Sequence, residues 1–121
     1  MDKWQALNTF WNSFSIPAYD ENTVPDDAQM PYITYYASVA GFEEPMSLNG
    51  SIWYHTNQWT NASKKADEIA EYIGTSYKAI KIDDGYMVVT KGSPFAQRLA
   101  DDDDSIRRIY ILINVEFCTE V

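Results

Sequence analysis

The sequence predicts an α+β fold: a single domain with a mainly antiparallel or mixed β-sheet, an N-terminal helix, and a central amphipathic helix packed on one face. Residues 51–59 alternate with the two-residue period of a strand, so that Ile52 and Tyr54 fall on one face and Trp53 and His55 on the other. Residues 60–74 then repeat at three- and four-residue steps, the period of a helix. A chain of 121 residues with 45% hydrophobic content suits one domain around one core.

The first predicted element is a helix over residues 1–14. Asp2 followed by Gln5 indicates a capping box at its start, and Pro17 ends the helical pattern soon after its last turn. Its apolar side chains form one stripe, in which all but one residue are aromatic: Trp4, Leu7, Phe10, Trp11 and Phe14. This stripe is interpreted as part of the core in preference to a docking surface.

Residues 17–30 have no period and predict a polar connection that contains the acidic pair Asp26 and Asp27. It is interpreted as a functional loop or as an ordered wrap over one sheet edge. Residues 31–39 alternate as a strand, and residues 41–50 turn the chain back toward the strand at 51–59. We expect these two strands to form an antiparallel hairpin whose long tip is kept polar by Glu43 and Glu44.

The central helix follows, with Thr60 or Asn61 as the expected N-cap and Gly74 as the C-cap. Its small apolar stripe would allow a close approach to the sheet, and it consists of Ala62, Ala66, Ile69, Ala70 and Ile73.

Two further strands are predicted at residues 77–82 and 86–90, joined by a tight turn in which Gly85 supplies the positive φ. Residues 91–94 are expected to break the second strand, and residues 95–100, which include Phe95 and Arg98, to form one helical turn. Asp101, Asp102, Asp103 and Asp104 then form an acidic loop tip. Residues 107–117 alternate most regularly and predict a central strand, with isoleucines on the core face and a polar opposite face.

The formal charge of −9 argues against a protein that grips nucleic acid, because such binding requires clustered Lys and Arg. Proximity to DNA without adhesion remains open. No signal peptide or membrane span is expected, which predicts synthesis in the cytosol and no membrane partner. The single Cys118 has no partner for an internal disulfide, in keeping with a reducing compartment.

No catalytic, cofactor or metal site is predicted, so a non-enzymatic protein is favoured. His55 is the only histidine, and a nucleophilic pair of Cys118 with His55 is the poorer interpretation of a lone cysteine. The run of four aspartates lacks the spacing of an EF-hand and is interpreted as a solvated loop. Aromatic residues are abundant, and for Trp53, Trp59 and Tyr110 a partner-binding surface and a core position both remain open.

The order of these segments resembles the small tail-terminator or tail-completion proteins encoded in bacteriophage and prophage morphogenesis clusters. The likeness rests on the aromatic helix closing with 14–17, the Val24-Pro25 and 31–35 segments, the strand leading into the helix at 59–73, and a final long strand ending Glu116-Phe117. It spans nearly the whole chain.

The resemblance implies a homo-oligomeric ring, a hexamer, that caps the phage tail tube, ends its polymerisation and joins tail to head. Implied partners are further copies of the chain, the tail tube protein and a head-completion or neck protein, with DNA passing through the ring; the implied location is the virion, after assembly in the host cytoplasm. Alternatives are another neck or head-completion protein or, more distantly, a small ligand-binding domain or enzyme. From the residues themselves, the expected contacts of the ring are Asp26, Asp27, Glu43, Glu44, Trp53, Trp59, Phe95, Arg98, Asp101, Asp102, Asp103 and Asp104.

Overall fold

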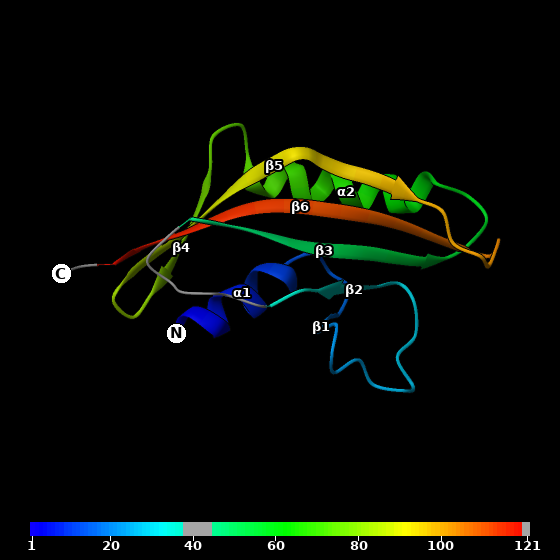
Figure 1. The fold of residues 1–121 in the computed structure, drawn as a ribbon, viewed down its shortest axis with the longest axis horizontal. Helices are drawn as coiled ribbons and strands as arrows, with labels where there is room; N and C mark the ends of the chain where they lie inside the picture. The colour runs from blue at the N-terminus through cyan, green and yellow to red at the C-terminus, as the bar shows by residue number, and fades with distance from the viewer. Residues whose placement is uncertain (38–44, 120–121) are drawn as a thin grey trace.

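A computed structural model of the chain describes residues 1–37 and 45–119 (Figure 1). Within this part of the chain, two helices accompany a six-stranded sheet. The elements are α1 (Lys3–Trp11), β1 (Ala18–Asp20), β2 (Tyr32–Tyr35), β3 (Met46–His55), α2 (Thr60–Ile73), β4 (Lys78–Ile82), β5 (Gly85–Leu99) and β6 (Ile106–Thr119).

The sheet is mixed, with the strand order β1-β2-β3-β6-β5-β4. Only β1 and β2 are parallel, while every other neighbouring pair is antiparallel. β6 lies at the centre, as its regular alternation predicts, because β3 and β5 pair with its two edges. The expected β2–β3 hairpin is confirmed, with Ile33 opposite Ile52.

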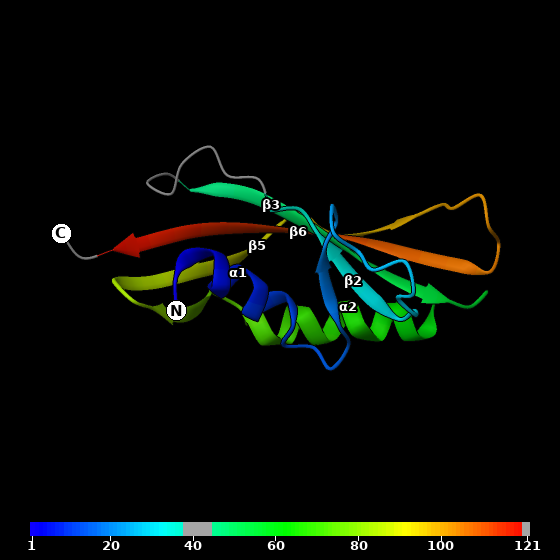
Figure 2. The same cartoon turned by 90° about the horizontal axis from the view of Figure 1, so that it is seen from below.

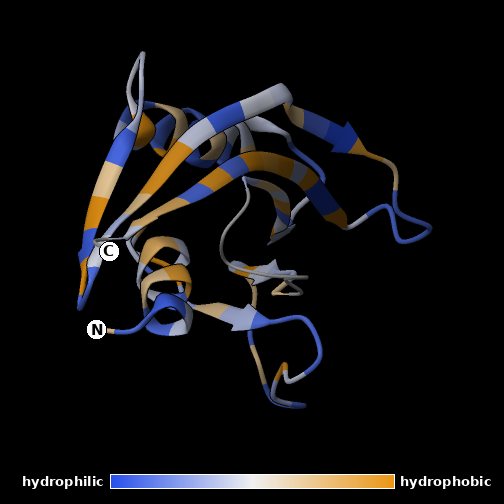
Figure 3. Cartoon of the chain, turned by 60° about the vertical axis from the view of Figure 1, so that its left-hand side comes forward, coloured by the Kyte–Doolittle hydropathy of each residue, from blue (hydrophilic) through white to orange (hydrophobic). Residues whose placement is uncertain are grey.

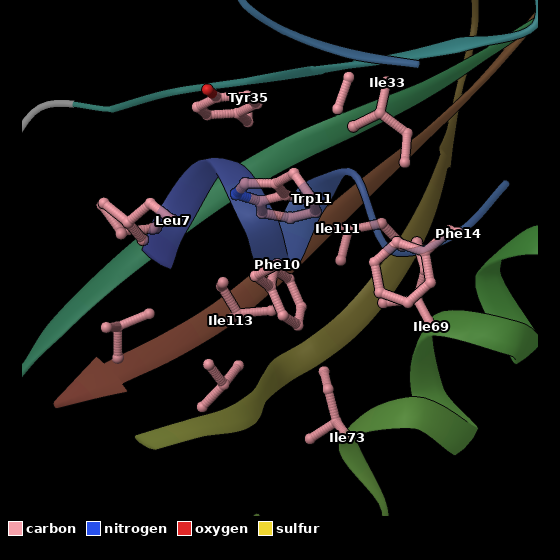
Figure 4. Packing of buried hydrophobic residues seen from close by; sticks show 14 of the residues in the cluster. Leu7, Phe10, Trp11, Phe14, Ile33, Tyr35, Ile69, Ile73, Ile111 and Ile113 are labelled. Atoms are coloured by element: carbon pink, nitrogen blue, oxygen red, sulfur yellow. The ribbon is translucent and has the colours of Figure 1, made fainter. Parts of the chain in front are cut away.

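Both helices cover the same face of the curled sheet, which we call the inner face (Figures 2 and 3). The predicted α+β class, with the central helix on one face, is therefore confirmed. The odd-numbered residues of β6 from Ile109 to Phe117 point into this face and are buried. Phe10 of α1 and Phe14, which follows the helix, contact Tyr72 of α2 with ring centroids 5.9 and 5.2 Å apart. Figure 4 shows Phe10 and Phe14 in one core with Ile69 and Ile73 of α2.

Gly50 of β3 permits a close packing contact in this core. The ring of Trp11 is fully buried and stacks on Tyr35 at 6.1 Å with only 9° between the ring planes. A Cβ at Gly50 would lie 2.7 Å from the Trp11 ring. Trp11 therefore occupies the space that a side chain at this strand position would take.

The capping box of α1 is confirmed, since the Asp2 carboxylate accepts from the Gln5 amide and the Gln5 side chain accepts from the Asp2 amide. The helix ends at Trp11, earlier than predicted, because the Asn12 side chain turns to donate to the Asn8 carbonyl and to accept from Ala18 of β1. Trp4 is 50% exposed, so its predicted place in the core stripe is wrong.

α2 is confirmed in extent, and its predicted stripe is buried except for the half-buried Ala70. Gly74 ends the helix with a φ of +83°. The predicted N-cap is wrong: Trp59 holds that position, and no side chain caps the first turn. A strand was predicted at residues 51–59, but β3 begins at Met46 and ends at His55. It starts earlier because its pairing with β6 begins at Met46. The part of the predicted 31–39 strand beyond residue 37 lies outside the described residues.

β5 differs most from prediction. The tight turn before it is confirmed, and Gly85 is required there because a Cβ would overlap the Cys118 carbonyl. The predicted break at residues 91–94 and the helical turn at 95–100 are wrong, since β5 continues to Leu99. Its register against β6 shifts between Lys91 and Ala96, and this irregularity accommodates Pro94, which cannot donate to a ladder.

Candidate assembly surfaces

The hairpin of β5 and β6 ends in a projecting loop formed by residues 101–104, which we call the acidic tip (Figures 1 and 3). All four aspartates are exposed. Asp101 accepts from the Asp103 amide at 2.9 Å, and Asp103 accepts from the Ser105 amide at 2.9 Å and from its hydroxyl at 2.6 Å. These two bonds from Ser105 lower the pKa of Asp103 below its ordinary value. The loop is therefore ordered by its own side chains.

Arg107 fixes the acidic tip to the body of the domain. Its guanidinium donates to the carbonyls of Asp104 and Asn57, each at 2.9 Å, and lies 3.5 Å from the Asp104 carboxylate. It also lies 5.4 Å from the centroid of the Trp59 ring. Because Trp59 is the N-cap residue of α2 and Asn57 lies between β3 and α2, this one side chain joins the tip, the β3–α2 connection and the start of the helix.

Arg98 approaches the same tryptophan, at 4.9 Å from the ring centroid, and donates to Ser63 of α2 at 3.2 Å. Of the predicted contact residues, Trp59 is thus approached by both Arg98 and Arg107, and Arg107 also contacts Asp104. Phe95 is half-buried and packs against the core. Sequence reasoning did not identify Arg107; its place at the start of the final strand was visible, but its partners depend on the fold.

A second cluster lies on the sheet face opposite the helices, which we call the outer face. The Trp53 indole donates to the Thr34 hydroxyl at 2.9 Å, and the Arg108 guanidinium lies 4.7 Å from the Trp53 ring centroid. Arg108 Nε donates to Ser51 Oγ at 3.0 Å, which satisfies a buried hydroxyl. We call these four residues the arginine–tryptophan patch. Trp53 was predicted as a contact residue, but Arg108 was not, since only the β3–β6 register places it beside Trp53.

The other end of the outer face is apolar. Tyr77 and Tyr86 are 60% and 47% exposed and, with Ala79, Val88 and Cys118, line a shallow pocket of about 440 Å³. His55 lies far from this pocket, near the acidic tip, where its Nε2 is 3.3 Å from Ser105 Oγ. His55 pairs with Ile106 at the start of β6, whereas Cys118 lies near the end of the same strand, opposite Tyr86. Nearly the full length of β6 therefore separates His55 from Cys118, which excludes a catalytic pair of these two residues.

The remaining predicted contacts fall elsewhere. Asp26 and Asp27 are exposed on the loop between β1 and β2, separate from both clusters. Glu43 and Glu44 lie outside the described residues. Within 1–37 and 45–119, no three His, Cys, Asp or Glu side chains are grouped so as to hold a metal ion. Neither helix of that part is long and apolar enough to cross a membrane.

Comparison with known proteins gives a likeness of fold. No family model and no curated protein matches the sequence. Among solved structures, the chain is similar to a component of the "Virion of native gene transfer agent (GTA) particle", with a TM-score of 0.55 and 13% sequence identity. The likeness covers 96% of this chain and 85% of that chain. Nearly the whole of this chain therefore has a fold that also occurs in a virion particle.

Proposed function

We propose that this chain is a structural protein of a phage-like virion that forms a homo-oligomeric ring, a hexamer, on the end of the tail tube. The observation that supports this most directly is the likeness of nearly the whole chain to a component of a gene transfer agent virion. In this proposal the ring covers the last tube subunits, ends polymerisation, and offers its other side to a head-completion or neck protein.

The two candidate surfaces suit such a role because one is a projecting loop and the other lies on the outer face of the sheet. Trp, Tyr and Arg are enriched where protein interfaces are buried, and the outer face carries all three. A ring needs two different surfaces on each subunit, since head-to-tail contacts close into a ring when the rotation between copies allows it. The projecting acidic tip and the uncovered outer face supply two such surfaces.

The surface charge agrees with DNA passing near the protein without binding it. The chain has 18 acidic and nine basic residues, and in the described part only Glu68, Asp83 and Asp104 form ion pairs. Most of the negative charge is therefore exposed and unpaired, and it would repel the phosphate backbone of DNA in a channel.

The test is native mass spectrometry from low to high micromolar concentration, with negative-stain images of any large species. A closed hexamer with a central hole is expected, and adding it to growing tail tubes should stop their elongation. A protein that stays monomeric and leaves tube length unchanged would contradict the proposal. A monomer that binds a head or neck component instead would indicate a neck protein.

A further inference from the structure

Arg108 carries a positive charge on the outer face that no carboxylate neutralises within the described residues. Its position is fixed by the Trp53 ring at 4.7 Å and by the Nε bond to Ser51 at 3.0 Å. Arg108 is half-buried, and neither terminal nitrogen is hydrogen-bonded within the described residues or among their fully buried unpaired atoms, so both retain access to solvent. A guanidinium held in this way is prepared to donate two parallel bonds to a carboxylate.

The acidic tip has the opposite surplus. Only Asp104 of its four aspartates forms an ion pair in the described structure, with Arg107. The loop is already ordered by Ser105 and Arg107, so binding a partner would cost little conformational entropy. It also stands at the far end of the long hairpin, beyond the body of the domain, where a second molecule can reach it (Figure 1).

We propose that the acidic tip of one copy docks on the arginine–tryptophan patch of the next copy, where Asp101 or Asp102 accepts hydrogen bonds from the two terminal nitrogens of Arg108. This inference rests on the proposed ring and names the contact between its subunits. Within one chain the tip forms no ion pair with Arg108, so its free carboxylates remain available to another copy. Tip and patch are different surfaces, so each copy can place its tip on one neighbour and receive the tip of another on its patch, which is the head-to-tail contact of a closed ring.

Charge reversal tests this contact. Arg108→Glu, and separately the pair Asp101→Lys and Asp102→Lys, should each weaken subunit association by about tenfold or more, because like charges would then face each other. An equimolar mixture of the two variants should restore the ring. When the variants alternate, the aspartates of one variant face the native Arg108 of the other, and the introduced lysines face the introduced glutamate, so every contact joins opposite charges. The matched control is Asp26→Lys with Asp27→Lys, which makes the same charge change on the β1–β2 loop and should leave assembly unchanged.

The outcomes separate this contact from the proposed function. Rings that form normally from Arg108→Glu would overturn the contact and leave the tail-capping role standing. Weak or transient association is captured by zero-length carbodiimide cross-linking of the Arg108→Lys variant, mixed as labelled and unlabelled copies. Links between copies from the introduced lysine to residues 101–103 support the contact; links only within one copy, or none, overturn it.

Discussion

The close approach of Gly50 to Trp11 gives the sharpest test of the packing. A Cβ at Gly50 would lie 2.7 Å from the Trp11 ring and 3.2 Å from the Thr34 carbonyl oxygen. The fully buried ring stacks on Tyr35, so it has no free space into which to withdraw. Overpacking costs about 1–3 kcal/mol, and replacing glycine within a strand returns about 0.5–1 kcal/mol. Gly50→Ala should therefore lower the free energy of unfolding by about 1–2 kcal/mol.

A double-mutant cycle with Trp11→Phe identifies the cause of that loss. Phenylalanine lacks the outer indole carbons that the new Cβ would meet, so the penalty of Gly50→Ala should fall nearly to zero in the Trp11→Phe background. The expected coupling energy is about 1 kcal/mol or more. Trp11→Phe itself should be milder than an ordinary truncation, because within the described chain the Trp11 Nε1 is buried without a hydrogen-bond partner.

The assay is urea unfolding followed by far-UV circular dichroism, which does not depend on tryptophan fluorescence. Gly74→Ala serves as the control: nothing lies within 4 Å of its added Cβ, and its cost comes from the φ of +83°. That cost should be the same with Trp11 or Phe in α1. If Gly50→Ala is equally destabilising in both backgrounds, overlap with the Trp11 ring is not its cause and the reasoning is refuted.

Three further outcomes are expected. Asp2→Ala removes the capping box of α1 and should cost about 1 kcal/mol in urea unfolding, whereas Asp102→Ala on the exposed tip should stay within about 0.5 kcal/mol. The pKa of Asp103 lies below its ordinary value of about 3.9, so the ordering of the tip by its ionised carboxylate is complete above that pH and is lost as the pH falls through the folded-state pKa. Ser105→Ala should raise this pKa in a carbon-13 NMR titration; an unchanged pKa would contradict the assignment to Ser105. Arg107→Lys keeps the charge but loses the forked donors, and amide exchange in the tip should become about tenfold faster; unchanged exchange would show that the tip is held by other contacts.

The features that the sequence predicted correctly depend on short-range patterns. The alternation through β6 defined its buried face because that pattern is unbroken from Ile109 to Phe117. The three- and four-residue period defined α2, and single residues marked the start of α1, at Asp2, and the tight turn before β5, at Gly85.

The features that could not be predicted depend on long-range pairing. β5 continues past Lys91 and Pro94 because β6 supplies a partner strand, although its own sequence reads as a break. Arg108 was correctly placed on the polar face of its strand by alternation alone. Its position over Trp53 follows from the register of β3 against β6, which no local pattern encodes.

The place of β6 in the sheet also determines when the domain can fold during synthesis. β6 is the last of the described strands to leave the ribosome, yet β3 and β5 meet only through it. Until β6 emerges, β3 and β5 lack the strand that pairs with both of them. Completing the sheet then requires pairing between residues as distant in sequence as Gly50 and Ile111. Such non-local pairing folds slowly, so the domain is expected to reach its native state only after β6 has emerged, when this middle strand is inserted last.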